Sequence, residues 1–329
     1  ESIEDLQSNN EIKQLSELYS PETLQLLYQI VINGKKDIYL APDLLTGFNT
    51  TLLRMLAFFP SLQTEKLESN LLEKRAGYLN TGTWSDKAIK EARIYDDIYE
   101  VASSKQANFN YIPKGYNIPT EYDYFHCTSN NTIFGTQMKA FPKCPIPMVC
   151  DMSSDIFSRS LDFSKFDLIY AGAQKNMGPA GTTLVVVRED VLGKVSRKIP
   201  SMMDYKVHID KSSMFNTPPV FPVYVSMLTL EWLKNLGGIK AIEEINEMKA
   251  RVMYSEIDLN PLFKGYSNKE DRSNMNATFT LINEDLKETF ETMIKEAGIN
   301  GLNGHRSVGG YRPSMYNAMP LDSVKALVE

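Results

Sequence analysis

A single charge lies between two apolar stretches in the segment AGAQKNMGPAG, residues 171–181. Lys175 follows DLIYAGA and precedes TTLVVV, and both stretches are typical of buried strands. Small residues flank the lysine, so little side-chain bulk surrounds its amine. Enclosure lowers the pKa of an amine and makes it nucleophilic. The segment therefore predicts an enclosed, reactive lysine, although a lysine in a loop is more often simply solvated.

Further polar side chains come directly after predicted strands, which are AGYLN, YFHCTS, PMVC and LIYAGA. These side chains are Thr81, Thr83, Trp84, Asn130, Asn131, Thr132, Asp151, Ser153, Ser154, Gln174 and Lys175. Parallel strands end at one edge of a sheet, where ligands of α/β proteins bind. Taken singly, an Asp after a strand is usually a turn residue and a Trp is usually in the core. Together, an amine, a carboxylate and an aromatic ring are what a pyridoxal phosphate enzyme requires: a Schiff-base lysine, a partner for the pyridine nitrogen and a ring that stacks.

The elements that would position these residues follow an α/β pattern. Strands apolar on both faces alternate with helices such as SDKAIKEAR, for which Ser85 is the expected N-cap, and this favours a mainly parallel sheet covered by helices. A long helix, VFPVYVSMLTLEWLKNLGG, ends at Gly237. Beyond it, ATFTLI predicts a strand and LKETFETMIKEAG an amphipathic helix. We therefore expect a large domain over residues 1–238 and a smaller α+β domain over residues 239–329.

Composition excludes several classes of protein. The chain has 329 residues and a net charge of -6, without a dense basic segment, so we expect no nucleic-acid partner. No stretch is long and apolar enough for a membrane helix, and we expect no membrane partner. Three cysteines without a CxxC pair and three scattered histidines argue against a disulfide framework or a metal site. These features favour a reducing, cytoplasmic location.

Several long segments resemble one enzyme family. HCTSNNTIFGT, VCDMSSDIFSRSLDFSKFDLIYAGAQKNMGPAG, MFNTPPVFPVY and GHRSVGGYRPSMYNAMP are similar to phosphoserine aminotransferases, over about residues 71–329. The resemblance implies a fold-type I pyridoxal phosphate transferase with a mainly parallel seven-stranded sheet in its large domain. It implies transamination between L-glutamate and 3-phosphohydroxypyruvate, giving O-phospho-L-serine and 2-oxoglutarate. It also implies possible action on the 4-phosphohydroxythreonine pair of vitamin B6 synthesis.

The resemblance also implies roles for individual residues. Lys175 would carry the Schiff base, and Asp151 would pair with the pyridinium nitrogen. Around the cofactor, Trp84 would stack on the ring, with Thr132 on its hydroxyl side and Gln174 near its phosphate. In a homodimer, Asn216 and Thr217 would reach the cofactor phosphate of the neighbouring subunit. His305 and Arg306 would face the substrate phosphate and Arg312 the α-carboxylate, groups that suit the two-pronged guanidinium.

The first 60 to 70 residues depart from the family. Its opening Asn-Phe-Ala-Gly-Pro segment is not found, and Gln25 and Leu26 stand by spacing where the family has a substrate-binding His-Arg pair. AFFPSLQ, residues 57–63, stands where a glycine-rich loop holds the cofactor phosphate, and of that loop only Ser61 remains. Pro60 has no N–H to donate. We expect weaker binding of cofactor and substrate, either because this N-terminal segment has truly diverged or because it is an altered region.

Three alternatives remain open at the level of sequence. The chain could be another small-chain aminotransferase, which an assay with glyoxylate as acceptor would separate. It could be a cysteine desulfurase, but Cys127 and Cys150 lie in predicted strands and Cys144 has only Lys143 beside it. It could also be a non-catalytic homologue, for which the departures before residue 71 are the only support.

Overall fold

The computed structural model describes residues 21–38, 43–57, 75–195 and 198–329, and divides the chain into two compact units. Unit 1 is Glu1–Asn70 and unit 2 is Leu71–Glu329. The sequence placed residues 1–70 at the start of the large domain, and this placement stays a prediction. Ser61 and the rest of the 58–74 segment lie outside the described residues.

Unit 1 contains two described helices, α2 (Pro21–Asp37) and α3 (Leu44–Ala57). Asp43 caps α3, because its carboxylate accepts hydrogen bonds from the N–H and the hydroxyl of Thr46, both at 2.8 Å. Gln25 and Leu26 both lie on α2. Apolar side chains of both helices are exposed, Tyr28 and Leu45 among them.

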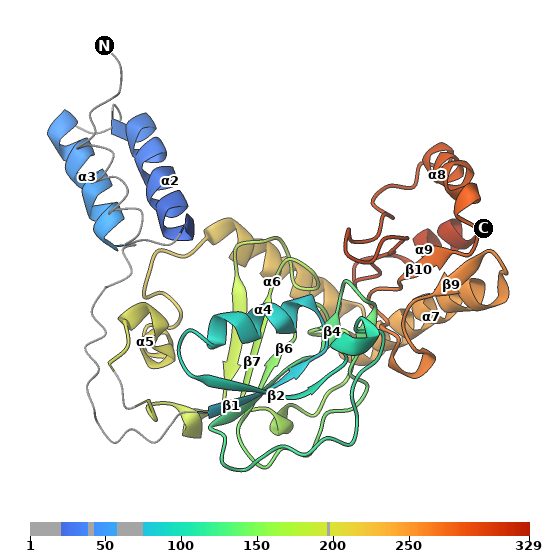
Figure 1. The fold of residues 1–329 in the computed structure, drawn as a ribbon, viewed down its shortest axis with the longest axis horizontal. Coiled ribbons are helices and arrows are strands. Elements are labelled where there is room, and N and C mark those ends of the chain that lie inside the picture. Colours follow the sequence, from blue (N-terminus) through green and yellow to red (C-terminus); the bar gives the residue numbers. More distant parts are fainter. Residues whose placement is uncertain (1–20, 39–42, 58–74, 196–197) are drawn as a thin grey trace, which may run out of the picture. The chain divides into compact units, whose positions relative to one another are not determined.

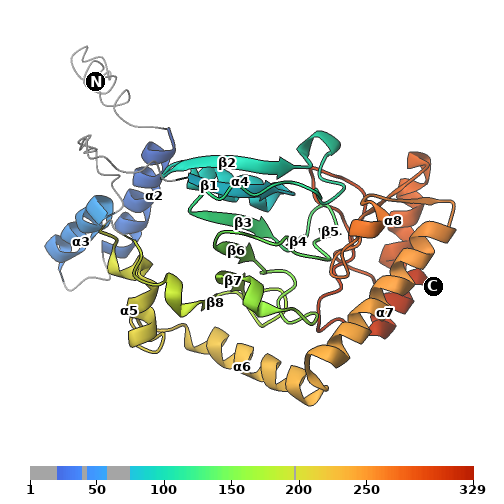
Figure 2. The same cartoon turned by 90° about the horizontal axis from the view of Figure 1, so that it is seen from below.

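Unit 2 is built on a central sheet, in which Figure 2 shows the strands side by side in the order β2-β1-β3-β6-β7-β8. The strands are β1 (Arg75–Asn80), β2 (Asp97–Ser103), β3 (Tyr124–Thr128), β6 (Met148–Asp151), β7 (Leu168–Gly172) and β8 (Thr183–Val187). All pairings are parallel except that of β7 with β8. The mainly parallel sheet is confirmed. The described residues supply six strands to this sheet, and the expected count of seven stays a prediction.

The sheet is apolar because its central strands are enclosed on both faces. Phe125, Cys127, Cys150 and Ile169 are at most 1% exposed and belong to one core cluster. A short hairpin of β4 (Asn130–Asn131) and β5 (Thr136–Gln137) follows β3. The continuous apolar pattern of the central strands is the reason that these strands could be predicted from the sequence.

The helix after β1 differs from its prediction at one end. Helix α4 is Thr83–Ala92, with Gly82 as its N-cap, so the assignment of Ser85 as N-cap was wrong. Ser85 is buried within the first turn, where its hydroxyl accepts hydrogen bonds from the N–H groups of Thr81 and Gly82. Short hydroxyl side chains bond to nearby main chain both at a cap and inside a first turn, and sequence alone does not separate the two.

The rest of unit 2 is mostly helical (Figure 1). Its elements are α5 (Tyr205–Asp210), α6 (Val220–Asn235), α7 (Gly238–Leu259), β9 (Phe263–Gly265), β10 (Phe279–Leu281), α8 (Lys287–Glu296) and α9 (Leu321–Val328). Gly237 follows α6 with φ 113°, as expected for a helix stop. A second core cluster joins α7 to β10 and α9, and includes Met253, Phe279 and Val324. A domain boundary near residue 238 stays a prediction.

No helix in the described ranges is long and apolar enough to cross a bilayer.

Candidate active site

The carboxyl edge of the sheet brings together residues that lie far apart in the sequence. Strands β1, β3, β6 and β7 run parallel, so the segments that follow them meet at the same edge. Trp84 comes from α4, Thr132 from the β4–β5 hairpin, and Lys175 from the turn after β7. The edge-of-sheet argument made from the sequence therefore predicted this meeting of residues correctly.

Three contacts join the centre of the site. The Nζ atom of Lys175 lies 5.8 Å from the centre of the Trp84 ring. The indole Nε1 of Trp84 donates to the Thr132 hydroxyl at 3.2 Å, and Arg312 Nη1 donates to the Thr132 main-chain oxygen at 3.1 Å. Thr132 thus ties the aromatic ring to the guanidinium, and both lie near the lysine.

Electrostatics make the amine of Lys175 unusual. Burial lowers its pKa, the Asp151 carboxylate opposes that shift, and the Arg312 guanidinium adds to it. A lowered pKa leaves more of the amine unprotonated near neutral pH, which is what a nucleophile needs. The enclosed, reactive lysine expected from the sequence is therefore consistent with its surroundings.

Asp151 is the last residue of β6 and is held by its own turn. Its Oδ1 accepts the Ser153 N–H at 2.9 Å, and it lies in register with Thr128 on β3 and Tyr170 on β7. The Thr128 hydroxyl is buried and has no hydrogen-bond partner among the described residues. Thr128 was not among the sequence-predicted residues, although its place at the end of a strand, two residues before Asn130, could have suggested it.

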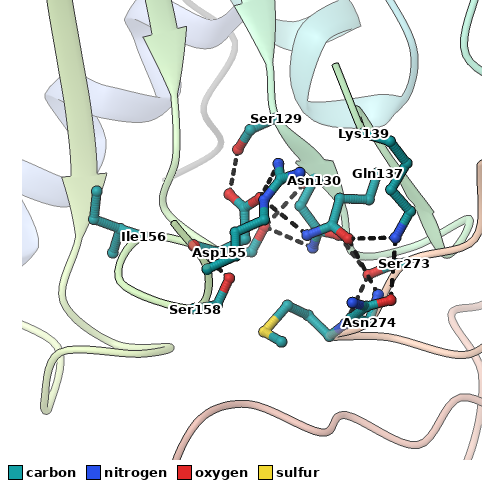
Figure 3. A network of polar contacts seen from close by, with 12 residues as sticks. Ser129, Asn130, Gln137, Lys139, Asp155, Ile156, Ser158, Ser273 and Asn274 are labelled. Atoms are coloured by element: carbon teal, nitrogen blue, oxygen red, sulfur yellow. Dashed lines mark hydrogen bonds and ion pairs between the residues drawn. The ribbon is translucent and has the colours of Figure 1, made fainter. Parts of the chain in front are cut away.

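A buried polar network supports the segment that follows Asp151 (Figure 3). Asp155 is fully buried, and its carboxylate accepts hydrogen bonds from the Ser129 hydroxyl, from Gln137 Nε2 at 3.1 Å and from Arg159 Nη2 at 3.0 Å. Gln137 in turn accepts from Lys139 Nζ at 2.9 Å. The buried carboxylate of Asp155 thus accepts three hydrogen bonds, whereas Nε of its partner Arg159 has no partner among the described residues.

The same network extends to the C-terminal half of unit 2. Asn130 Nδ2 donates to Ser154 Oγ at 2.9 Å and to Asn276 Oδ1 at 3.1 Å, while its Oδ1 accepts from Ser273. Lys139 Nζ also donates to Asn274 at 3.1 Å. The hairpin, the Asp151 turn and the 273–276 segment are therefore held together by side-chain amides and hydroxyls, a support that sequence reasoning missed.

Other predicted residues have no described contact with the centre of the site. Gln174 precedes Lys175 in the chain but is exposed, and so are Asn216 and Thr217, which precede α6. His305 and Arg306 lie in a turn in which His305 Nδ1 bonds with the Ser307 hydroxyl at 2.8 Å. Within the described residues, the side chains of these five show no hydrogen bond or ring contact with the side chains of Lys175, Trp84 or Thr132. Their assigned roles remain predictions, as does that of Ser61.

Comparison with known proteins assigns the family. The model of the aminotransferase class-V family matches residues 98–327. A phosphoserine aminotransferase of Flavobacterium psychrophilum is 66% identical over 270 residues, which cover 82% of this chain and 76% of that protein. This chain belongs to the phosphoserine aminotransferase family. The resemblance stated from the sequence motifs is therefore confirmed.

Solved structures of this family agree with the fold. The phosphoserine aminotransferase of Bacillus circulans subsp. alkalophilus matches with a TM-score of 0.75 at 42% identity, over 78% of this chain and 72% of that chain. The PLP-bound enzyme of Trichomonas vaginalis matches with a TM-score of 0.73 at 35% identity, over 78% of this chain and 74% of that chain. The expected fold-type I architecture is confirmed.

The first unit matches a different family. The model of DNA polymerase III subunits gamma and tau domain III matches residues 2–70, which are nearly all of unit 1. Gln25, Leu26 and the AFFPSLQ segment all lie within that match. Two family models therefore bear on this segment, and the placement of these residues at aminotransferase positions by spacing stays a prediction.

Proposed function

We propose that this chain is a pyridoxal phosphate-dependent transaminase acting on O-phospho-L-serine and L-glutamate with their 2-oxo acids. The observation that carries the proposal is the convergence of Lys175, Trp84, Thr132 and Arg312 at one edge of the sheet, in a chain of the phosphoserine aminotransferase family. The same site would take the 4-phosphohydroxythreonine pair, whose phosphate and amino-acid ends have the same chemistry.

The residues present fit the ring of pyridoxal phosphate. A flat indole, a carboxylate at a strand end and an amine of lowered pKa are the groups such a ring needs around it. Buried polar atoms without described partners lie beside them: Arg312 Nε and the Thr128 hydroxyl. Buried polar groups are normally hydrogen-bonded, so these two support a polar ligand there.

Each residue has a defined part in the proposed reaction. The cofactor, when bound, accepts electrons from the substrate Cα; Asp151 would hold its ring nitrogen protonated, and Trp84 would cover one ring face. Lys175 would attach the cofactor and, once released, move a proton from the substrate Cα. Burial of the amine suits this task because a base works best with its pKa near the working pH.

Substrate binding is assigned to cations. Arg312 would hold the α-carboxylate, since its Nη1 is fixed by the Thr132 carbonyl and its Nε is free to donate among the described residues. His305 and Arg306 would hold the substrate phosphate. The loop that carries them begins only a few residues before Arg312, which would allow one loop to contact both ends of a phosphorylated amino acid.

We also infer a homodimer. Asn216 and Thr217 are exposed, and α6 after them exposes Val220 and Phe221, which are 71% and 69% exposed. Exposed apolar side chains at one place favour a partner surface. A second copy seated there would receive Asn216 and Thr217 at its own cofactor phosphate. Sedimentation velocity tests this: a monomer at assay concentrations would contradict the inference.

Replacing Lys175 tests the function. Lys175→Ala should abolish both the absorbance of bound cofactor near the visible range and the conversion of phosphoserine, while circular dichroism stays unchanged. Arg312→Ala is the matched variant, expected to keep the absorbance and raise the KM for both amino donors. A wild-type protein that takes up no pyridoxal phosphate, or that takes it up without turnover, would contradict the proposal; the second outcome is the one expected of a non-catalytic homologue.

The cysteine desulfurase alternative finds no support in the described thiols. Cys127 and Cys150 are 0% exposed, and burial raises the pKa of the half-buried Cys144. A desulfurase needs an accessible thiolate. Assaying phosphohydroxypyruvate against glyoxylate as acceptor separates the remaining aminotransferase alternatives.

For unit 1 we propose no part in the aminotransferase site. Its match to another family and its separate contacts support this. Gln25→Arg is the test: if Gln25 stood in place of a substrate-binding cation, the added charge would lower the KM for phosphoserine, and we expect no change.

A further inference from the structure

A fully buried lysine on α7 has no carboxylate partner in the described part of the chain. Lys249 is 0% exposed, and its Nζ donates to the main-chain oxygens of Met315, Tyr316 and Met319 at 3.0, 2.8 and 3.0 Å. Three acceptors satisfy all three N–H groups of an ammonium. A buried charge is costly unless fully bonded, so this lysine fixes the 315–319 segment to the helix more firmly than an apolar side chain could.

The same segment is tied to the turn that carries Lys175. Asn317 donates its main-chain N–H to Asn176 Oδ1 at 3.0 Å, and Asn176 is the residue after Lys175. Asn176 Nδ2 also donates to the oxygens of Ser154 and Ile156, in the turn after Asp151.

Asn317 is held from the other side by α7. Asn246, one turn before Lys249 on the buried face of the helix, donates to Asn317 Oδ1 at 2.9 Å and to the Ser158 oxygen at 3.0 Å. Asn317 Nδ2 in turn donates to the Phe157 oxygen at 2.9 Å. All three asparagines of this chain of contacts are at most 5% exposed.

Arg312 lies just before the segment that Lys249 holds. Its main-chain N–H donates to Leu302 at 2.7 Å, and Met315, three residues on, donates its N–H to Met275 at 2.7 Å. The backbone from Arg312 to Met319 is thus fixed at both ends, and its centre contacts the residue beside Lys175.

We propose that Lys249, Asn246, Asn317 and Asn176 form a latch that sets the position of Lys175 relative to Arg312. The four are positioning residues and do not touch substrate. The inference rests on the proposed function in one respect, since it takes Lys175 and Arg312 as the groups that meet the amino and carboxylate ends of the substrate.

The latch has a consequence for Lys175 that a purely structural role lacks. Burial and the Arg312 guanidinium both hold the pKa of Lys175 down. Releasing the 315–319 segment would loosen the Lys175 turn and let Arg312 move away, and both changes raise the pKa of Lys175. A substitution on α7, far from Lys175 in the sequence, should therefore raise the pKa of Lys175.

The experiment measures lysine reactivity in the cofactor-free full-length protein. Competitive acetylation with trace acetic anhydride at a series of pH values, followed by peptide mass spectrometry, gives the pKa of each lysine. Lys249→Met keeps the length of the side chain but removes its donors, and we expect it to raise the pKa of Lys175 by about one unit. Asn246→Ala, which removes only two hydrogen bonds, should shift it in the same direction by less.

Asn274→Ala is the matched control, because Asn274 accepts from Lys139 in the network of Figure 3 and takes part in none of the hydrogen bonds described above for the four latch residues. This control should alter the acetylation of Lys139 and leave that of Lys175 unchanged. The α7 variants should leave the acetylation of Lys139 unchanged. If the α7 variants fold and the pKa of Lys175 is unchanged, the proposal is overturned. It is also overturned if the acetylation of Lys139 and Lys175 is accelerated equally, because that result indicates a general loosening of the fold.

If neither α7 variant folds, the result also counts against the latch. The contacts of Lys249 and Asn246 would then stabilise the fold as a whole rather than position Lys175. The readout needs neither cofactor nor turnover. Loss of the proposed function and loss of the latch are therefore separate results.

Discussion

His126 should make the stability of unit 2 depend on pH. It lies in β3, 3% exposed, with its ring stacked on Tyr78 at 4.7 Å and its Nε2 bonded to the Tyr170 hydroxyl at 2.9 Å. Its Nδ1 is buried and has no hydrogen-bond partner among the described residues. A protonated imidazole needs two acceptors, and this site supplies at most one, so the folded protein favours the neutral ring.

The magnitude follows from the pKa. Burial lowers the pKa of His126 from 6.5 to about 4. Between these values the unfolded chain binds more protons than the folded one, so the free energy of unfolding falls as the pH falls from 6.5 to 4. At 1.36 kcal/mol per unit, the loss is about 3 kcal/mol, a large part of the stability of an ordinary domain.

The assay is urea unfolding followed by tryptophan fluorescence, which reports on unit 2 because both tryptophans, Trp84 and Trp232, lie there. We expect the wild type to lose about 3 kcal/mol more than His126→Phe between pH 6.5 and pH 4. The variant loses the Tyr170 contact at every pH, a constant offset of about 1 kcal/mol. Parallel pH profiles for the two proteins would refute the reasoning.

Three further substitutions have defined outcomes. Asp155→Ala leaves a nearly buried guanidinium without its carboxylate and should lower the free energy of unfolding by about 3–5 kcal/mol in urea titrations. Gly310→Ala places a Cβ against a main-chain oxygen at φ 59° and should lower the Tm more than Gly309→Ala, which has φ 73° but open space around it. The Arg272 guanidinium lowers the pKa of Asp258 to about 2, so Asp258→Asn should abolish the part of the stability that the wild type loses as the pH falls from about 4 to 2.

The sequence predicted the strands of the sheet best where both of their faces are buried. β3, β6 and β7 are short, apolar and followed by polar residues, so their type and the edge at which they end could be inferred together. β2 escaped prediction because Asp97–Ser103 lies at the edge of the sheet and mixes exposed charged and half-buried residues. Edge strands lack the continuous apolar pattern on which such predictions depend.

The N-terminal assignment rests on weaker ground and stays a prediction. Spacing relative to a family motif is informative only while the chain remains in that family, and residues 2–70 match a second family model. The absence of glycines from AFFPSLQ was a true observation. The abrupt start of matching motifs near residue 71 coincides with the division of the chain into two units after Asn70.

Buried asparagines are the sequence signal that could have located the supports of the site. Where strands end at the carboxyl edge, the chain leaves regular structure, and its main-chain groups need other partners. An amide supplies both donors and an acceptor, so it can satisfy two segments at once. The asparagines that do so are Asn130, Asn176, Asn246, Asn276 and Asn317, each at most 5% exposed.

An apolar residue at any of these positions would fill the space but leave buried polar groups unpaired: main-chain groups at Asn176, Asn246 and Asn317, and side-chain groups at Asn130 and Asn276. The cost is about 1–3 kcal/mol for each buried group left without a partner. Asn176 and Asn317 both lie within segments that resemble the family, AGAQKNMGPAG and GHRSVGGYRPSMYNAMP, beside the lysine and the arginines of the predicted site. The charges define the chemistry available at this edge, and the amides between them determine whether those charges are held at the distances that the chemistry requires.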